Sequence, residues 1–233
     1  MEILRHDLAR RLIRLDPTKR FRIIHGDEVR SYLGDCWDPD REAGPLTITF
    51  AVGGAGAQKE IAAGAVKSLS GLIKEGKIRL NLVATHRQEV RDYFVKLAEK
   101  NGLSASGNIR ILYDPDKNEY FRQFNALLRD TDILWTKPSE MSFYCGLGLP
   151  IVIAPPIGPH EVCNQRWLRD LGAGLHQADP QYCSEWITDY LVDGKLSLAA
   201  WDGFLYARKL GVEKIVEVLT TGKMERHYNP LLR

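Results

Sequence analysis

The sequence of 233 residues has no long apolar run, no strong net charge and no pair of closely spaced cysteines. A membrane-spanning helix needs about 20 consecutive apolar residues, and every apolar run here is far shorter. Basic side chains are spread through the first 20 residues, where a signal peptide would need an apolar stretch. The net charge of +2 gives no strong field toward nucleic acid or acidic partners. We therefore expect a cytoplasmic protein without a nucleic acid partner, and we expect any membrane contact to be peripheral.

The cysteines and histidines lack the spacing of a metal site. None of the four cysteines, Cys36, Cys145, Cys163 and Cys183, belongs to a CxxC pair, which argues against a zinc or redox motif. Cys145 and Cys163 fall in apolar, regularly patterned segments and are expected to be buried thiols. No metal ligand set is expected, and a reducing cytoplasm fits this cysteine content best.

Short apolar runs alternate with segments of helical periodicity over most of the chain. An apolar content of 44% and a charged content of 27% are ordinary for a globular protein. Such alternation predicts an α/β fold, a Rossmann-like parallel sheet with helices on both faces. Ligands bind such sheets outside the carboxyl ends of the strands. The expected strands are residues 46–52, 78–84, 109–113, 132–135 and 150–154.

The two ends of the chain differ from this pattern. Residues 1–15 read as an amphipathic helix that ends at Asp16-Pro17, and residues 18–44 are polar and rich in turn signals. We expect 1–44 to be an N-terminal helix and connector. Residues 45–222 are expected to form the α/β domain, with one last helix over 198–219, and 223–233 a C-terminal tail.

A glycine-rich segment, Gly53–Gln58, follows the first expected strand and opens the next helix. Small residues let a phosphate approach the backbone, and a helix N-terminus offers free N–H groups. The alternative is a tight strand-to-helix turn with no ligand. No GK[ST] follows, and the end of the second strand lacks the acidic residue of an NAD site, so both a Walker loop and NAD are disfavoured.

Two further polar segments follow expected strands. Residues 136–140, TKPSE, place Lys137, Ser139 and Glu140 after the fourth strand, where they could hold ribose and phosphate or simply cap a helix. A rigid proline turn after the fifth strand leads into a helix that begins with polar residues. These polar groups could bind the hydroxyls of a sugar, or cap the helix and face solvent. They are His160, Glu161, Asn164 and Gln165.

Three segments together resemble the C-terminal, donor-binding half of GT-B glycosyltransferases. They are TFAVGGAGAQKE, DILWTKPSEMSFYCGLGLPIVIAPP and PHEVCNQRWLRDLGAGL. The resemblance covers about Leu46 to Leu219 and points toward the branch that contains the peptidoglycan-intermediate N-acetylglucosaminyltransferase and monogalactosyldiacylglycerol synthase. It implies that 45–222 form a nucleotide-sugar-binding domain and that 1–44 are a remnant of an acceptor domain or an interdomain linker. It implies a nucleoside diphosphate sugar as donor, of which a UDP-sugar is one candidate, and no required cofactor.

The resemblance also implies a role for individual residues. The diphosphate would meet Gly53, Gly54, Ala55, Gly56, Ala57, Gln58 and Lys137. The base and ribose would lie by Tyr113, Ser139 and Glu140. The donor sugar would face His160, Glu161, Asn164 and Gln165. The catalytic residue is not identified, because no side chain here stands out as a general base.

The chain departs from the family pattern in two ways. The family's ribose-binding glutamate falls at Phe143, whereas Glu140 lies one helical turn earlier. Only residues 1–44 precede the donor-binding half, although a GT-B enzyme has an N-terminal acceptor half. The resemblance thus implies either a truncated chain, lacking that N-terminal domain, or a separate acceptor-binding protein as partner.

The favoured hypothesis is a module that binds the donor for transfer of a hexose-type sugar from a nucleoside diphosphate sugar. The alternatives are a non-catalytic nucleotide-binding or scaffolding module, and a GT-B-fold epimerase or hydrolase of sugar nucleotides. Fold alone does not separate these hypotheses.

Overall fold

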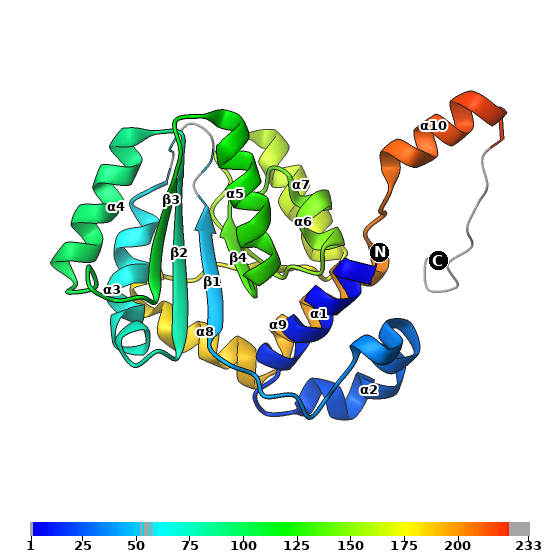
Figure 1. The fold of residues 1–233 in the computed structure, drawn as a ribbon, viewed down its shortest axis with the longest axis horizontal. Helices are drawn as coiled ribbons and strands as arrows, with labels where there is room; N and C mark the ends of the chain where they lie inside the picture. Colours follow the sequence, from blue (N-terminus) through cyan, green and yellow to red (C-terminus); the bar gives the residue numbers. More distant parts are fainter. Residues whose placement is uncertain (1, 52, 54–55, 57, 224–233) are drawn as a thin grey trace.

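The computed structural model describes residues 2–51, 53, 56 and 58–223. A single six-stranded sheet, in which all strands are parallel, forms its centre, in the order β3-β2-β1-β4-β5-β6 (Figure 1). The strands are β1 Leu46–Ala51, β2 Ile78–Thr85, β3 Ile109–Tyr113, β4 Ile133–Thr136, β5 Ile151–Ile153 and β6 Gly174–His176. The predicted α/β class is confirmed.

Helices cover both faces of the sheet and form two hydrophobic cores. Neighbouring residues of a strand point to opposite faces, so Trp135 belongs to one core and Leu134 to the other. Helices α3 Ile61–Lys74, α4 Gln88–Lys100, α8 Cys183–Val192 and α9 Lys195–Tyr206 contribute to the first core. Helices α5 Lys117–Asp130, α6 Met141–Gly146 and α7 Pro159–Asp170 contribute to the second.

The N-terminal helices α1 Glu2–Arg14 and α2 Arg20–Leu33 pack into the first core. Leu8 and Leu12 of α1 are completely buried. The sequence predicted no helix in residues 18–44, because their composition is polar and rich in turn signals. The structure forms α2 there because the buried Asp16 carboxylate accepts hydrogen bonds from the backbone N–H groups of Phe21 and Arg22, both at 3.0 Å. A residue expected only to end one helix also caps the next.

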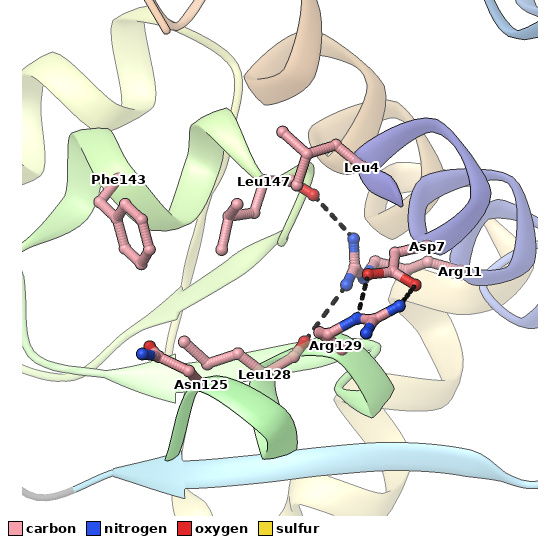
Figure 2. Close-up of a pocket in the computed structure, with 8 residues that line it drawn as sticks. All are labelled: Leu4, Asp7, Arg11, Asn125, Leu128, Arg129, Phe143 and Leu147. Atoms are coloured by element: carbon pink, nitrogen blue, oxygen red, sulfur yellow. Dashed lines mark hydrogen bonds and ion pairs between the residues drawn. The ribbon is translucent and has the colours of Figure 1, made fainter. Parts of the chain in front are cut away.

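Arg11 joins α1 to the rest of the molecule (Figure 2). Its side chain is 2% exposed and donates to the carbonyl oxygens of Thr131 at 2.8 Å and Leu147 at 2.9 Å. Longer bonds reach the carbonyls of Gly148 and Leu128. These carbonyls end α5 and α6, where helices leave acceptors unpaired and carry partial negative charge. Burial lowers the pKa of Arg11 to about 10, so the guanidinium stays charged at neutral pH.

Two other predictions of local structure were wrong. The helix expected over 198–219 is divided into α9 and α10 Gly211–Thr221 by a non-helical segment, 207–210. Cys163 is exposed rather than buried, whereas Cys145 is buried as expected. The short edge strand β6 was not predicted; its Gly174 lies so close to β5 that a Cβ there would be 2.6 Å from Ile153 Cδ1.

No helix in the described part of the chain has the length and apolar character needed to cross a membrane. The same residues contain no group of three or more His, Cys, Asp or Glu side chains placed to hold a metal ion.

Candidate functional site

Polar side chains meet at the carboxyl edge of the sheet, where β1, β4 and β5 end side by side. The hydroxyl of Thr136 donates to the Ala51 carbonyl at 3.1 Å and ties the last residues of β4 and β1 together. On the other side, the N–H of Ala154 donates to the Thr136 carbonyl at 2.9 Å. The segments after the three strands are therefore held close to one another.

Lys137 lies against the start of the glycine-rich segment. Its side chain runs so close to Gly53 that a Cβ at this position would lie 2.9 Å from both Cδ and Nζ of the lysine. Any larger residue at position 53 would displace the lysine, so glycine is required for this contact. The Lys137 ammonium also donates to Glu161 Oε1 at 2.9 Å.

Glu161 is a buried carboxylate, 2% exposed, in the first turn of α7. Its Oε2 accepts the backbone N–H of Ile157 at 2.7 Å, and its Oε1 accepts from Lys137. Burial alone would raise the pKa of this carboxyl, but the Ile157 N–H and the Lys137 ammonium outweigh it and hold the pKa below its usual range. Glu161 thus carries a fixed negative charge that orients Lys137.

Gln58 connects the glycine-rich segment to the proline turn after β5. Its side-chain amide donates to the Pro155 carbonyl at 2.6 Å, and its backbone is left-handed, with φ of 68°. The helix expected to open at Gln58 begins at Ile61. Gly54, Ala55 and Ala57, three of the residues expected at the diphosphate, lie outside the described residues.

Arg87 is a second basic residue at this edge, and it was not among the predicted site residues. It follows β2 and precedes α4, and a Cβ at Gly56 would lie 3.3 Å from its Cδ. Gly56 itself has a φ of 71°, which favours glycine. Arg87 also forms an ion pair with Glu89 at 3.5 Å. The sequence pattern places Arg87 just after the second strand, where the absence of an acidic residue argues against NAD but does not reveal the approach of Arg87 to Gly56.

Thr85, two residues before Arg87, is conformationally strained. A φ of 58° is unusual for a β-branched residue. Its buried hydroxyl has no hydrogen-bond partner among the described residues. Strained backbone of this kind is concentrated at functional sites, so the strain supports the location of the candidate site at this edge of the sheet.

The other predicted residues lie around this centre, and the Ser139 N–H donates to the backbone carbonyl of Lys137 at 2.8 Å. Glu140 accepts a hydrogen bond from the Tyr144 hydroxyl at 2.8 Å, and burial together with Glu140 raises the pKa of Tyr144. Ser139 is exposed. Tyr113 ends β3, across the sheet, where the guanidinium carbon of Arg91 lies 5.8 Å from the centre of its ring.

The four polar residues of α7 that the sequence singled out differ in their contacts. Asn164 donates to the Pro138 carbonyl at 3.0 Å and so links α7 to the segment after β4. His160 is 77% exposed, with Nε2 3.9 Å from Glu161 Oε1. Gln165 lies one turn further along and lines a shallow surface hollow with Val162 and Arg166. Of the four, Glu161 alone is in contact with Lys137.

Residues 83–199 match the family described as "Domain of unknown function (DUF6938)", which is just over half of the chain. The chain belongs to this family. The matched segment includes Arg87, Lys137 and Glu161 but begins after the glycine-rich segment. No curated protein matches the chain.

Solved structures share the fold at low sequence identity. A UDP co-structure of MnaA from S. aureus aligns with a TM-score of 0.56 and 12% identity, over 80% of this chain and 50% of the other. A putative UDP-N-acetylglucosamine 2-epimerase from Listeria monocytogenes aligns with a TM-score of 0.53 and 13% identity, over 77% and 45%. The chain therefore spans about half the length of these proteins, and the likeness shows the fold alone. The predicted Rossmann-like fold is thus confirmed.

Proposed function

We propose that this chain binds a nucleoside diphosphate sugar at the carboxyl edge of β1 and β4. The observation that carries the proposal is the placement of two basic side chains, Lys137 and Arg87, against Gly53 and Gly56 of one glycine-rich segment. Glycines allow close approach of a diphosphate to the backbone, and flanking cations balance its charge. The UDP named for the S. aureus protein supports a uridine nucleotide as the first candidate.

In this proposal the other polar residues surround the diphosphate. Gly54, Ala55, Ala57 and Gln58 extend the contact with the phosphates. Tyr113, Ser139 and Glu140 hold the base and ribose. His160, Glu161, Asn164 and Gln165 face the sugar, and Glu161 also keeps Lys137 in place through the 2.9 Å contact. No cofactor is required.

The reaction that we propose is transfer of a hexose-type sugar, in which the nucleoside diphosphate leaves the anomeric carbon. Cationic groups that are already in place stabilise the charge that develops on such a leaving group, and Lys137 is suited to this role. The acceptor is proposed to bind a further domain or a separate protein chain. Bound donor without turnover is therefore the expected state of this chain alone.

Calorimetric titration with UDP, other nucleoside diphosphates and their sugars tests the binding step. In Lys137→Met the ammonium is lost but the aliphatic stem remains, so loss of a charge-assisted hydrogen bond should weaken binding about 10- to 100-fold. The double variant Lys137→Met/Glu161→Gln removes both charges of the Lys137–Glu161 pair and leaves Arg87 in place. It should bind nucleotide as weakly as Lys137→Met. Equal affinities would show that the loss of the phosphate contact, and not the unpaired Glu161 carboxylate, weakens binding in the single variant.

The matched control is Lys77→Met, which removes the lysine of another Lys–Glu pair. Lys77 directly precedes β2 and so lies at the amino edge of the sheet, opposite the site. Its Nζ is 2.7 Å from Glu75. Nucleotide affinity should be unchanged in this control. The proposal is wrong if folded wild-type protein binds no nucleotide, or if Lys137→Met binds as tightly as Lys77→Met.

NMR of a bound UDP-sugar distinguishes the reactions. Unchanged donor is expected from this chain alone, with transfer appearing once an acceptor-binding domain and acceptor are added. Interconversion of two UDP-sugars without acceptor would indicate an epimerase, and release of free sugar a hydrolase. Persistent binding without any reaction in the completed system would indicate a non-catalytic module.

A further inference from the structure

Thr85, the last residue of β2, combines two features that lower the stability of a folded protein. Its φ of 58° lies in the left-handed region, which a β-branched residue rarely adopts. Its buried hydroxyl has no hydrogen-bond partner among the described residues. A glycine at this position would adopt the same backbone without strain and would bury no hydroxyl. The stability of the fold therefore does not explain why the chain has a threonine here.

The left-handed backbone of Thr85 belongs to the turn that connects β2 to α4. The Arg87 N–H donates to the Ala84 carbonyl at 3.2 Å, which closes a turn with Thr85 at its first central position. Turns with a positive φ at this position are dominated by glycine, asparagine and aspartate. The register between β2 and β3 shifts just before Thr85, which pairs with Tyr113. The direction in which the chain leaves the sheet is thus set at Thr85.

Both ends of this turn are attached to regular structure. The Thr85 carbonyl accepts the N–H of Asp114, the residue after β3, at 3.2 Å. The Arg87 carbonyl accepts the Arg91 N–H at 3.1 Å in the first turn of α4. The conformation of the two central residues, Thr85 and His86, therefore determines the direction in which the Arg87 side chain leaves the backbone.

Arg87 leaves the turn toward the glycine-rich segment. A Cβ at Gly56 would lie 3.3 Å from Cδ of Arg87 and 4.0 Å from its Nε. The same Cβ would lie 2.9 Å from Cγ2 of Val90, so the backbone of Gly56 rests on both residues. A segment that becomes ordered only during binding lowers the affinity, whereas a turn that is already fixed avoids this cost.

The buried side chain of Thr85 is the anchor of this turn. Thr85 is 7% exposed, so rotation of the turn would have to move a branched side chain through a closely packed interior. Branching at Cβ also restricts the rotamers of threonine. Glycine has no such side chain and adopts many backbone conformations. The threonine therefore fixes the turn, whereas a glycine would leave it free to move.

We propose that Thr85 is a positioning residue of the nucleotide site, whose buried side chain and left-handed backbone hold Arg87 against Gly56. The inference rests on the proposed nucleotide binding and adds to it the reason why Arg87 points toward the diphosphate. Strained residues persist where the surrounding structure determines their conformation, and the strain is then part of how a site is preorganised. The ligand-bound state thus gains from the threonine what the free protein loses.

Calorimetric titration of Thr85 variants with UDP tests this role. Thr85→Gly keeps the turn accessible but removes its anchor, so the affinity for UDP should fall about 3- to 10-fold. Thr85→Val restores the branched shape without the hydroxyl and should recover most of the lost affinity. Lys19→Gly is the matched control, because Lys19 has nearly the same φ, 59°, and precedes α2. It should not change the affinity for UDP.

A double-mutant cycle with Arg87→Met separates positioning from a general effect on the fold. Arg87→Met removes the guanidinium, so adding Thr85→Gly to it should cause no further loss of UDP affinity. A threonine that merely supports the fold would lower the affinity by the same factor in both backgrounds, and that result would overturn the proposal. So would a Thr85→Val variant that binds UDP as weakly as Thr85→Gly.

NMR relaxation of the protein without nucleotide tests the turn independently of the proposed function. The order parameters of the Arg87 backbone amide and Nε should fall in Thr85→Gly but not in Thr85→Val or Lys19→Gly. Equal order of Arg87 in the wild type and Thr85→Gly would overturn the inference. A wild type with an ordered Arg87 that binds no UDP would instead overturn the proposed nucleotide binding, and the control of Arg87 by Thr85 would stand.

Discussion

The two edges of the sheet use basic side chains in different ways. At the amino edge, Arg11 is buried and donates to four backbone carbonyls at the ends of α5 and α6. At the carboxyl edge, Lys137 is 21% exposed, donates to one carboxylate and lies over a glycine. An ammonium has three hydrogens to donate. The comparison indicates that Arg11 stabilises the fold, whereas Lys137 retains capacity for a ligand.

The largest effect is expected from Arg11→Met. The substitution leaves backbone carbonyls in a buried region without their donor, and such a loss costs about 3–5 kcal/mol of stability. The free energy of unfolding in urea measures it. Arg10→Met, on the same helix and 28% exposed, should cost less than about 1 kcal/mol. Equal losses in the two variants would contradict a special structural role for Arg11.

A smaller effect is expected from Asp132, a second buried charge at the amino edge. Its Oδ2 accepts the Thr47 N–H at 2.8 Å, and Arg14 lies 3.3 Å from Oδ1. Burial raises the pKa of Asp132 to about 6, although Arg14 and Thr47 oppose the shift. The folded protein therefore holds this proton to a higher pH than the unfolded chain does. Stability should fall as the pH rises from about 4 to about 6, by on the order of 2–3 kcal/mol from this group.

Asp132→Asn should remove that part of the pH dependence. Urea unfolding of both proteins between pH 4 and pH 7 gives the difference in slope. Asp202, whose pKa is also raised to about 6 by burial, titrates in both proteins and cancels in the comparison. Identical slopes for the two proteins would show that Asp132 does not carry the expected shift.

The strands of the sheet could be predicted from the sequence, whereas the contacts between side chains at its edges could not. Strands β1 to β5 are apolar runs long enough to be recognised, and the motifs after them pointed to Lys137 for the diphosphate and Glu161 for the sugar. The segment TKPSE showed that Lys137 follows a strand, but not that its side chain lies on Gly53. That contact depends on tertiary packing between residues 84 positions apart in the chain.

The features that were missed depend on single side chains with distant partners. Helix α2 needs the Asp16 carboxylate, and the break before α10 needs the Lys209 contacts with the end of α9. Arg87 reaches Gly56 because β1 and β2 are neighbours in the sheet, and composition does not reveal that order. Periodicity therefore predicts the elements, whereas the junctions between them follow from specific hydrogen bonds.

The smallest effect is expected from Lys77→Met, which tests whether the contribution of a Lys–Glu pair to stability depends on its exposure to solvent. Their contacts are similar, 2.7 Å for Lys77–Glu75 and 2.9 Å for Lys137–Glu161, but the side chains are 68% and 55% exposed in the first pair and 21% and 3% in the second. Solvent screens the first pair, so Lys77→Met should change the free energy of unfolding by less than about 0.5 kcal/mol. Lys137→Met leaves Glu161 charged and buried, and should cost on the order of 2–3 kcal/mol, part of which Glu161→Gln in the same chain restores. Similar losses of stability in Lys77→Met and Lys137→Met would mean that the Ile157 N–H alone stabilises the Glu161 carboxylate. Lys137 would then contribute to ligand binding and not to the stability of the fold.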